Sequence, residues 1–403
     1  MKRDGEIRPL GDVCEVIAGQ SPSGSAYNAS GVGLPFYQGK KEFGEKFIRP
    51  PSTWTTQITK RALVGDILMS VRAPVGPINF ATEEICIGRG LAAIRARPGL
   101  NQNFLFYHLL SIQSQICGRD GAVFPSISRG EICALELWVP PLSEQQGIVG
   151  ILDEMLVGLA TATANAGKNL KSAGEILQAT INAALTSPEG NSWPSENLSS
   201  LVIAGKGISY GVVKPGRPDP SGVRVIKSQQ VRDGWMDLSE DFRITNKLDK
   251  EYARTRLQGG EVLLNLVGAS IGRSAIAPKE ITGANVTRAV AVIPVPHELA
   301  EWVQYNLRGR VGQMLIRSST GGTAQPVLNL REVKNLPIPL PPLEVRAAIV
   351  EKLNMASEEV ANLQLLYERR REVLAELRHS VLQKAFSGEL TSPPSSAIKE
   401  AAE

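Results

Sequence analysis

The stretch VPPLSEQQGIVGIL begins at Val139, and the stretch LPPLEVRAAIVEKL begins at Leu340. The two stretches match at a fixed offset of 201 positions, and the match needs no gap from about Phe124 to Thr186. A repeat of this length describes a duplicated unit of roughly 200 residues, which is too long for the period of a solenoid. The chain is therefore predicted to contain two related halves.

Upstream of this match the resemblance between the halves continues, but the offset drifts. VIAG at Val16 recurs at Val202, GDILMSV at Gly65 resembles GEVLLNLV at Gly260, and IGRGLAAI at Ile87 resembles VTRAVAVI at Val286. Drifting offsets indicate insertions and deletions in surface loops between ordered blocks. Each half is thus predicted to be a globular unit followed by a segment whose register is fixed.

The segments after the two Pro-Pro pairs have a helical apolar period, and each is predicted to be a helix of about 40 residues, roughly 60 Å long. The first helix carries five glycines, each of which costs about 1 kcal/mol of helix stability relative to alanine, so we expect it to pack antiparallel on the second. The predicted coiled-coil seam comprises Ile148, Leu152, Met155, Leu159, Ile176, Ile349, Leu353, Val360, Leu363, Tyr367, Leu374, Leu377 and Val381. Asn169 and Arg370 interrupt the seam at matching positions; a polar residue there can fix the register, and an exposed residue is an equally good account.

These observations predict a mixed α/β (α+β) fold with two globular domains and two long helices that form an antiparallel coiled coil, arranged as a dumbbell with pseudo-two-fold symmetry. The predicted boundaries are residues 1–140 and 188–340 for the globular domains, 141–187 and 341–390 for the helical arms, and 391–403 for a disordered tail. Within the globular domains we expect strand–turn–strand pieces at 65–76 and 260–272, helices at 101–116 and 298–315, and a closing strand before each arm.

Composition narrows the class of protein. The N-terminus has no apolar run behind its basic residues, no apolar span of 18 residues is expected, and the four cysteines form no CxxC pair, so we expect a cytoplasmic protein with reduced thiols. Residues 1–140 and 191–340 carry net charges of +3 and +6, whereas residues 141–190 and 341–403 carry −3 and −2. Basic globular parts beside acidic helices are compatible with a polyanionic partner, although small surface imbalances are common.

Polar loops between the repeated blocks supply candidate ligand contacts. Gln, Asn and Arg side chains can bond base edges, and Lys and Ser side chains more often hold phosphates. For any single one of these residues, a solvated loop position is the simpler account. The candidates are Gln20, Ser21, Tyr27, Asn28, Gln38, Lys40, Lys41, Arg72, Arg89, Lys206, Ser209, Tyr210, Lys227, Gln229, Gln230, Arg232, Arg273, Asn285 and Arg288.

Catalytic signatures are missing from the sequence. No Pro-Pro pair stands in the Asn/Asp-Pro-Pro-aromatic form of DNA amino-methyltransferases, and no Gly-Lys pair is followed by Ser or Thr as in a phosphate-binding loop. The three histidines lie far apart, without neighbouring cysteine or carboxylate clusters, so no metal site and no catalytic residues are predicted. The sequence favours a recognition protein over an enzyme.

The chain resembles the specificity subunit of type I restriction–modification systems. The resemblance lies in the two Pro-Pro-Leu helix entries, in LRHSVLQKAFSGEL at Leu377, and in the segments GQSP, LPFYQGKKEF and GDILMSVRAPVG of the first unit. It covers about residues 10–390, and the Gly- and Ala-rich first helix is its weakest part.

The resemblance implies a mechanism. Each globular unit would be a target-recognition domain that reads one half of a bipartite, asymmetric sequence in double-stranded DNA. The helices would set the gap between the halves and dock two methyltransferase subunits, which bind S-adenosylmethionine. Restriction subunits, with motor and nuclease activities that use ATP and magnesium, would join for DNA cleavage in phage defence, and this chain would hold no cofactor of its own. The alternatives are a reader in a solitary or type II-like methylation complex, and a coiled-coil scaffold that binds only protein.

Overall fold

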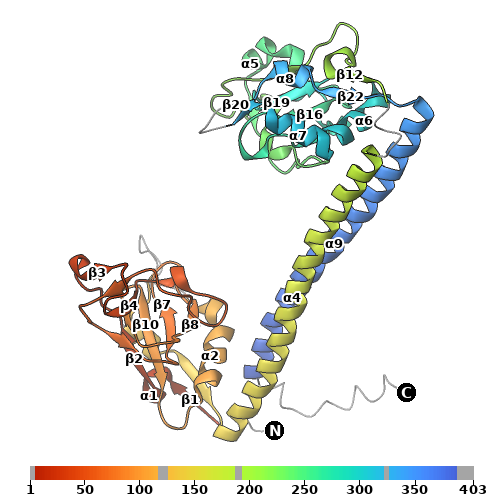
Figure 1. Cartoon of the computed structure of the whole chain (residues 1–403). Coiled ribbons are helices and arrows are strands. Elements are labelled where there is room, and N and C mark those ends of the chain that lie inside the picture. Colours follow the sequence, from red (N-terminus) through yellow and green to blue (C-terminus); the bar gives the residue numbers. More distant parts are fainter. Residues whose placement is uncertain (1–4, 117–125, 187–192, 322–325, 388–403) are drawn as a thin grey trace, which may run out of the picture. The chain divides into compact units, whose positions relative to one another are not determined.

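The computed structural model describes residues 5–116, 126–186, 193–321 and 326–387, so the predicted tail at 391–403 lies outside the described residues. By their contacts the residues separate into two units. Unit 1 comprises Met1–Gly167 with Glu368–Glu403, and unit 2 comprises Lys168–Tyr367. Each unit contains one mixed α/β globular part and about half of each long helix (Figure 1).

Unit 1 is built on two sheets. An antiparallel sheet has the strand order β2-β10-β7-β8, a second sheet has the order β3-β5-β4-β9-β6, and β1 pairs with β11. The strands are β1 (Glu6–Pro9), β2 (Cys14–Ala18), β3 (Tyr27–Asn28), β4 (Leu34–Tyr37), β5 (Trp54–Thr55), β6 (Arg61–Ala62), β7 (Ile67–Ser70), β8 (Ile78–Phe80), β9 (Ile85–Ile87), β10 (Leu91–Ala96) and β11 (Glu136–Val139). The helices of its globular part are α1 (Leu10–Val13), α2 (Gln102–Ser111) and α3 (Arg129–Cys133).

Unit 2 repeats this plan with shorter strands. Its antiparallel sheet has the order β13-β19-β16-β17, its second sheet has the order β15-β14-β18, and β12 pairs with β22. The strands are β12 (Ser195–Asn197), β13 (Ser209–Tyr210), β14 (Val223–Ile226), β15 (Arg243–Ile244), β16 (Val262–Asn265), β17 (Ser274–Ile276), β18 (Asn285–Val286), β19 (Val290–Ile293), β20 (Thr320–Gly321), β21 (Val327–Leu328) and β22 (Pro337–Pro339). The helices of its globular part are α5 (Asn246–Glu251), α6 (His297–Arg308), α7 (Arg310–Ser318) and α8 (Leu330–Lys334).

The central strands β7 and β16 are apolar on both faces because each separates two cores. In β7, Ile67 and Met69 pack into the core that includes α2, whereas Leu68 packs into the core of the second sheet. Successive strand side chains point to opposite faces, so a continuous apolar run is needed where both faces are covered. The strand β16 repeats the arrangement, with Leu264 in one core and Leu263 in the other.

The shared VIAG sequences at 16–19 and 202–205 are not structurally equivalent. Gly19 directly follows β2, and Gln20 donates its backbone N–H to Ile87 O at 3.0 Å. The same bond in unit 2 runs from Val212 to Val286 O at 2.8 Å. The residue equivalent to Gly19 is therefore Gly211, and residues 202–205 precede β13 in an irregular segment. The four shared residues VIAG therefore give a wrong alignment of the two halves at this point, because an insertion lies next to them in unit 2.

A glycine is required at this pair of positions because the backbone approaches another strand closely. A Cβ at Gly19 would collide with the carbonyl oxygen of Gly88, and a Cβ at Gly211 would collide with that of Val286. The absence of a side chain thus allows the loop after β2 or β13 to pack closely against the end of a parallel strand pair. The pair is β4–β9 in unit 1 and β14–β18 in unit 2.

The two long helices, α4 (Leu142–Leu185) and α9 (Leu343–Ser387), pair within each unit. In unit 1, Leu152 near the start of α4 shares a core with Val381 and Leu382 near the end of α9. In unit 2, Ile181 near the end of α4 packs with Leu353 near the start of α9. Both contacts require helices that run in opposite directions, which confirms the predicted antiparallel pairing.

The predicted seam is wrong at four of its thirteen residues. Most of its members are buried or half-buried, but Met155, Ile176, Leu363 and Leu377 are 39%, 59%, 40% and 46% exposed. The contacting positions fall one residue later, at Leu156 and Leu177 in α4. Adjacent apolar pairs in α4 fit steps of four then three residues as well as three then four, so the 3.5-residue average did not settle the register. Asn169 and Arg370 are exposed and do not interrupt the seam.

Two further expectations change. The single helix predicted at 298–315 is broken into α6 and α7 at Gly309, which has an extended backbone conformation and lies against Leu185 of α4. The helix α4 contains an 18-residue window with a mean hydropathy of 1.5, which is long and apolar enough to cross a membrane by length and composition alone. The expectation that the chain holds no such span is therefore wrong, although a Gly- and Ala-rich helix packed against α9 passes the same test.

Candidate nucleic-acid interface

In unit 1 several strands end at one place, and the residues that follow them form a cluster. Backbone bonds tie these ends together: Gly88 donates to Tyr37 O at 2.8 Å, and Val71 donates to Gly90 O at 2.9 Å. The loops after β2, β4, β7 and β9 are thereby brought side by side. They carry the predicted residues Gln20, Ser21, Gln38, Arg72 and Arg89.

Within this cluster Ser21 is the internal link. Its hydroxyl donates to Gln38 Oε1 at 3.3 Å and accepts the backbone N–H of Arg89 at 3.2 Å. The side chains of Gln38 and Arg89 are exposed. Among the described residues neither Arg72 nor Arg89 forms an ion pair, so both guanidinium groups are available to an anionic or base-edge partner.

The other candidates in unit 1 lie around the cluster. Tyr27 stacks on Phe36 with ring centroids 4.8 Å apart, and its hydroxyl donates to Pro22 O. Asn28 closes its own turn by accepting the N–H groups of Ser30 and Val32. Both side chains therefore have structural roles. Lys40 and Lys41 lie exposed in a short 3-10 turn directly after Gln38 and Gly39.

Unit 2 has the same backbone framework at this place. Thr287 donates to Ile226 O, and Leu266 donates to Ala289 O, as Gly88 and Val71 do in unit 1. The framework therefore defines equivalent positions in the two units. They are Gln20 and Val212, Gln38 and Lys227, Arg72 and Val267, and Arg89 and Arg288. Only the last pair keeps its side chain, so the two units present different chemistry from one scaffold.

Around this place in unit 2, Arg288 and Tyr210 line a pocket of about 220 Å³ with Val213 and Val327. Arg288 is exposed, and Tyr210 is 39% exposed. Lys206 is held by Gln258, whose Oε1 accepts from Nζ at 2.7 Å. Ser209 lies half-buried in β13, beside Tyr210. Arg288 and Tyr210 are thus the predicted residues that unit 2 exposes here.

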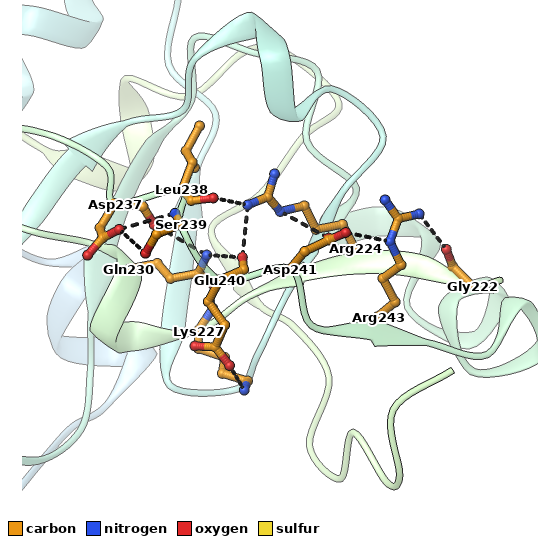
Figure 2. A network of polar contacts seen from close by, with 10 residues as sticks. All are labelled: Gly222, Arg224, Lys227, Gln230, Asp237, Leu238, Ser239, Glu240, Asp241 and Arg243. Carbon is orange, nitrogen blue, oxygen red and sulfur yellow. Dashed lines mark hydrogen bonds and ion pairs between the residues drawn. The ribbon is translucent and has the colours of Figure 1, made fainter. Parts of the chain in front are cut away.

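An acidic loop, residues 237–241, binds four of the other candidates: Lys227, Gln229, Gln230 and Arg232. Figure 2 draws the contacts of Lys227 and Gln230 with this loop. Lys227 and Gln229 bond the carboxylate of Glu240, and Arg232 pairs with Asp237 at 2.9 Å. The same loop is fastened by Arg224, whose guanidinium donates to the carbonyl oxygens of 238 and 240. These acidic partners engage the cations and shape the loop, and no pattern in the sequence predicts them.

Asp237 is the anchor of this loop. Hydrogen bonds from the Ser239 side chain, followed by those from Arg232, lower the pKa of Asp237 to about 2. The side chain of Lys227 likewise lowers the pKa of Glu240. A carboxyl whose folded pKa lies below its unfolded value of about 3.9 stabilises the folded loop above about pH 4, and this contribution is lost as the pH falls through about 2.

We therefore expect a nuclear magnetic resonance titration of the Asp237 carboxyl to give a midpoint near 2 in the wild type. In Ser239→Ala the midpoint should rise toward the ordinary aspartate value, because the hydroxyl no longer bonds the carboxylate. Asp219 provides an internal reference in the same spectra, because its contacts are unchanged by the substitution. A wild-type midpoint near 3.9 would contradict the loop geometry.

Two candidates are buried and belong to the framework. Asn285 is fully buried; its amide donates to Asp249 and to Tyr252 O, and its Oδ1 accepts from Thr255 at 2.7 Å. Gln230 is 2% exposed and bonds the backbone of Lys227 and of the acidic loop. Their prediction as ligand contacts is wrong, because an amide side chain beside a strand serves a buried network as readily as a surface.

Replacing Asn285 by alanine should destabilise unit 2 by about 1–3 kcal/mol, because Asp249 and Thr255 would lose a partner inside the protein. Chemical denaturation followed by circular dichroism measures this loss. Arg288→Ala, an exposed substitution three residues away, is the control and should stay within about 0.5 kcal/mol of the wild type. Equal stability of the two variants would show that the Asn285 network is not formed.

A repeated contact fixes each globular part to its own stretch of helix, and the sequence analysis missed it. In unit 1 the Tyr107 hydroxyl donates to Asp153 of α4, which also pairs with Lys46 at 3.0 Å. In unit 2 the Tyr305 hydroxyl donates to Asn354 of α9 at 2.8 Å. Asp153 and Asn354 differ by the repeat offset of 201, which is the signal that would have found the pair. Burial raises the pKa of both tyrosines, so both hydroxyls remain donors at neutral pH.

In the described part of the chain, no group of three or more His, Cys, Asp or Glu side chains is placed to hold a metal ion. Cys14 and Cys86 are buried free thiols, Cys133 is half-buried, and Cys117 lies outside the described residues. Arg308, Arg310 and Arg317 were not among the predicted residues, because on α6 and α7 they read as the polar face of an amphipathic helix.

Comparison with known protein families gives a match over most of the chain. Residues 2–165 and 219–365 match the family described as "Type I restriction modification DNA specificity domain". Over 150 residues the chain is 43% identical to the putative type I restriction enzyme MjaX specificity subunit of Methanocaldococcus jannaschii, a match that spans 36% of this chain and 35% of that relative. It is 27% identical over 357 residues to the type I restriction enzyme EcoBI specificity subunit of Escherichia coli, covering 81% of this chain and 74% of the relative.

Solved structures share the fold. A chain from a structure described as the basis of complex assembly and conformational transition of the type I R-M system superposes with a TM-score of 0.73, covering 96% of this chain and 98% of that chain at 18% identity. The HsdS subunit from Thermoanaerobacter tengcongensis superposes with a TM-score of 0.54, covering 96% and 97% at 19% identity. The predicted mixed α/β class with two globular domains and two long helices is thereby confirmed.

Proposed function

Because this chain belongs to the type I restriction–modification DNA specificity family, we propose that it reads a bipartite, asymmetric DNA target, with one globular unit for each half-site. The observation that carries the proposal is the shared framework with different side chains. Equivalent positions hold Gln38 and Lys227, or Arg72 and Val267, on the same backbone bonds. Hydrogen-bonding side chains at base edges discriminate sequence, so two divergent surfaces suit two different half-sites.

The paired helices supply the surface for partner subunits. Both helices keep apolar side chains exposed although they pair with each other, and exposed apolar patches of this kind mark protein–protein contacts. The exposed residues include Ile151, Met155, Val157 and Ile176 in α4, and Met355, Leu363, Leu365, Leu366, Val373 and Leu377 in α9. We assign this surface to two methyltransferase subunits, and the complex would recruit restriction subunits for cleavage.

In this proposal the chain is non-catalytic and works in the cytoplasm. S-adenosylmethionine would be bound by the methyltransferase subunits, and ATP and magnesium by the restriction subunits. A solitary or type II-like methylation complex would use the same reading surfaces without the restriction subunits. A scaffold that binds only protein does not account for the net positive charge of the two globular units. It also does not account for the different loop side chains that they carry on a shared backbone framework.

Methylation-sensitive sequencing tests the proposal. Cells are made to express this chain together with a methyltransferase encoded by a neighbouring gene. Their DNA should carry one bipartite motif, with modified adenine in both halves. Cells that express the methyltransferase alone are the control and should lack the motif. A stable complex of the two proteins without any methylated motif would refute DNA reading and would favour the scaffold.

A further inference from the structure

A groove in unit 2 gathers four arginines. It lies where α6 and α7 meet the loop before β17 and the end of α4, and it has a volume of about 820 Å³. Arg273, Arg308, Arg310 and Arg317 line it, and Asp233 is the one acidic residue among the described lining residues. Its polar content distinguishes it from the apolar pockets along the long helices.

The groove is built by fixed contacts. Gln178 of α4 donates to the carbonyl oxygen of Arg308 at 2.9 Å, and Asn182 accepts the backbone N–H of Arg310 at 2.7 Å. Gln313 donates to Gly272 O at 2.9 Å, which ties α7 to the loop before β17. These bonds hold the break between α6 and α7 against α4, and the break directs the first turn of α7 into the groove.

The charges in the groove are largely uncompensated. Arg308 is 5% exposed and pairs with Asp233 at 2.9 Å. Within the described ranges, Arg273, Arg310 and Arg317 form no ion pair, and all three are exposed. Arginines that line one groove with a single acidic neighbour favour the binding of an anion there. Arginine, with its planar fork of donors, is well suited to bind phosphate.

The length of the groove suits an extended polyanion. Arg310 and Arg317 are two turns apart on one face of α7, so their Cα atoms are separated by about 10.5 Å along the helix axis. A single DNA strand carries one charge for about every 3.4 Å of helix axis. The row of guanidinium groups therefore spans more than one phosphate.

The groove lies beside the candidate reading surface of unit 2. The short loop 267–272 joins them. At its start Val267 bridges to Val327, which lines the Arg288 pocket, and at its end Gly272 leads directly to Arg273. Phosphate contacts that flank base-reading contacts fix the register of a protein on the duplex.

Unit 1 differs at the equivalent positions. Pro77 accepts the bond from Ser70 that Arg273 accepts from Asn265 in unit 2. Leu110, three residues after Tyr107, stands where Arg308 follows Tyr305. At these two described positions, unit 1 replaces an arginine with an uncharged residue.

We infer that the arginine groove of unit 2 binds the phosphate backbone of DNA next to its half-site. The inference rests on the proposed function.

The test is the triple variant Arg273→Ala, Arg310→Ala and Arg317→Ala, studied in complex with the methyltransferase subunit. The DNA duplexes contain the motif found by methylation-sensitive sequencing. Binding to them is measured by fluorescence anisotropy from about 50 to 200 mM salt. The matched control removes three exposed cations of α5 and the following turn, by Lys247→Ala, Lys250→Ala and Arg254→Ala. Both variants therefore lose the same charge. The melting temperature of each variant is measured alongside the titrations and should stay near that of the wild type in the groove variant, because the three replaced side chains are exposed.

We expect the groove variant to bind at least about tenfold more weakly at low salt, with the slope of log K against log salt reduced by about two to three units. Its methylated motif should be unchanged, because phosphate contacts carry no sequence information. The control should keep the wild-type slope. A wild-type slope in the groove variant, an altered motif, or an equal loss in the control would overturn the inference while leaving the proposed function intact. Failure of the wild-type complex to bind the duplex would overturn both.

Discussion

Exchange of residues 1–140 for the equivalent segment of another family member will change one half of the methylated motif completely and leave the other half intact. The side chains that differ between the units, among them Gln20, Gln38 and Arg72, all lie in loops carried by this segment. Unit 2 keeps its own framework and its own Arg288. Methylation-sensitive sequencing reads both halves of the motif in a single experiment.

The exchange must preserve the contacts that hold unit 1 on its helices. Tyr107 bonds Asp153, and Asn101 donates its backbone N–H to Gln145 of α4 at 2.7 Å. A donor segment that retains the tyrosine should dock correctly. The reciprocal exchange of residues 193–340 is the control, and it should alter only the opposite half. A change in both halves after either exchange would show that the units do not read independently.

Leu353→Asp should strongly destabilise unit 2. The Leu353 side chain is fully buried against Ile181 of α4 and Tyr305 of α6. Truncation of a buried leucine alone costs about 2–5 kcal/mol, and a buried carboxylate without a partner adds to that loss. We expect a destabilisation of at least about 4 kcal/mol, measured by chemical denaturation, together with loss of methylation.

Leu363→Asp is the matched control, ten residues further along the same helix. Its side chain is 40% exposed, so the change should cost less than about 1 kcal/mol. A regular heptad repeat places both leucines in the seam and therefore predicts a similar loss of stability for the two variants. Comparable destabilisation by the two variants would restore the expected register and contradict the packing described for α9.

The sequence predicted an element of the fold correctly where its pattern allowed only one interpretation. The Pro-Pro pairs and the helical period after them identified α4 and α9 and their opposite directions, because a glycine-rich helix needs a partner. The seam register did not follow, since Met155 and Leu156 are both apolar and only the packing chooses between them. The break at Gly309 is accompanied by a bond from Arg310 to Asn182 of α4, which is far away in sequence.

The site was predicted less well than the fold. The cluster of Gln20, Gln38 and Arg89 assembles because strand ends meet. The block pattern identified these loops as candidates but did not predict that they come together. Asn285 was misassigned, since a polar residue in a strand does not reveal whether it faces a network or solvent. The arginines of the groove come from separate elements, and their convergence follows from the tertiary contacts of Gln178 and Gln313 rather than from any local motif.

The tyrosine contacts also bear on how a duplicated chain folds without error. Two similar globular parts and two similar helices allow each part to settle on the wrong helix. Lys46 finds a carboxylate at Asp153 but would meet an amide at Asn354, whereas Asn354 donates to Glu301 at 3.0 Å, a carboxylate that Asp153 would repel. Partner choice is set by what the incorrect pairing loses as well as by what the correct one gains. The difference between the carboxylate of Asp153 and the amide of Asn354 thus favours docking of each globular part on its own helix over docking on the helix of the other half.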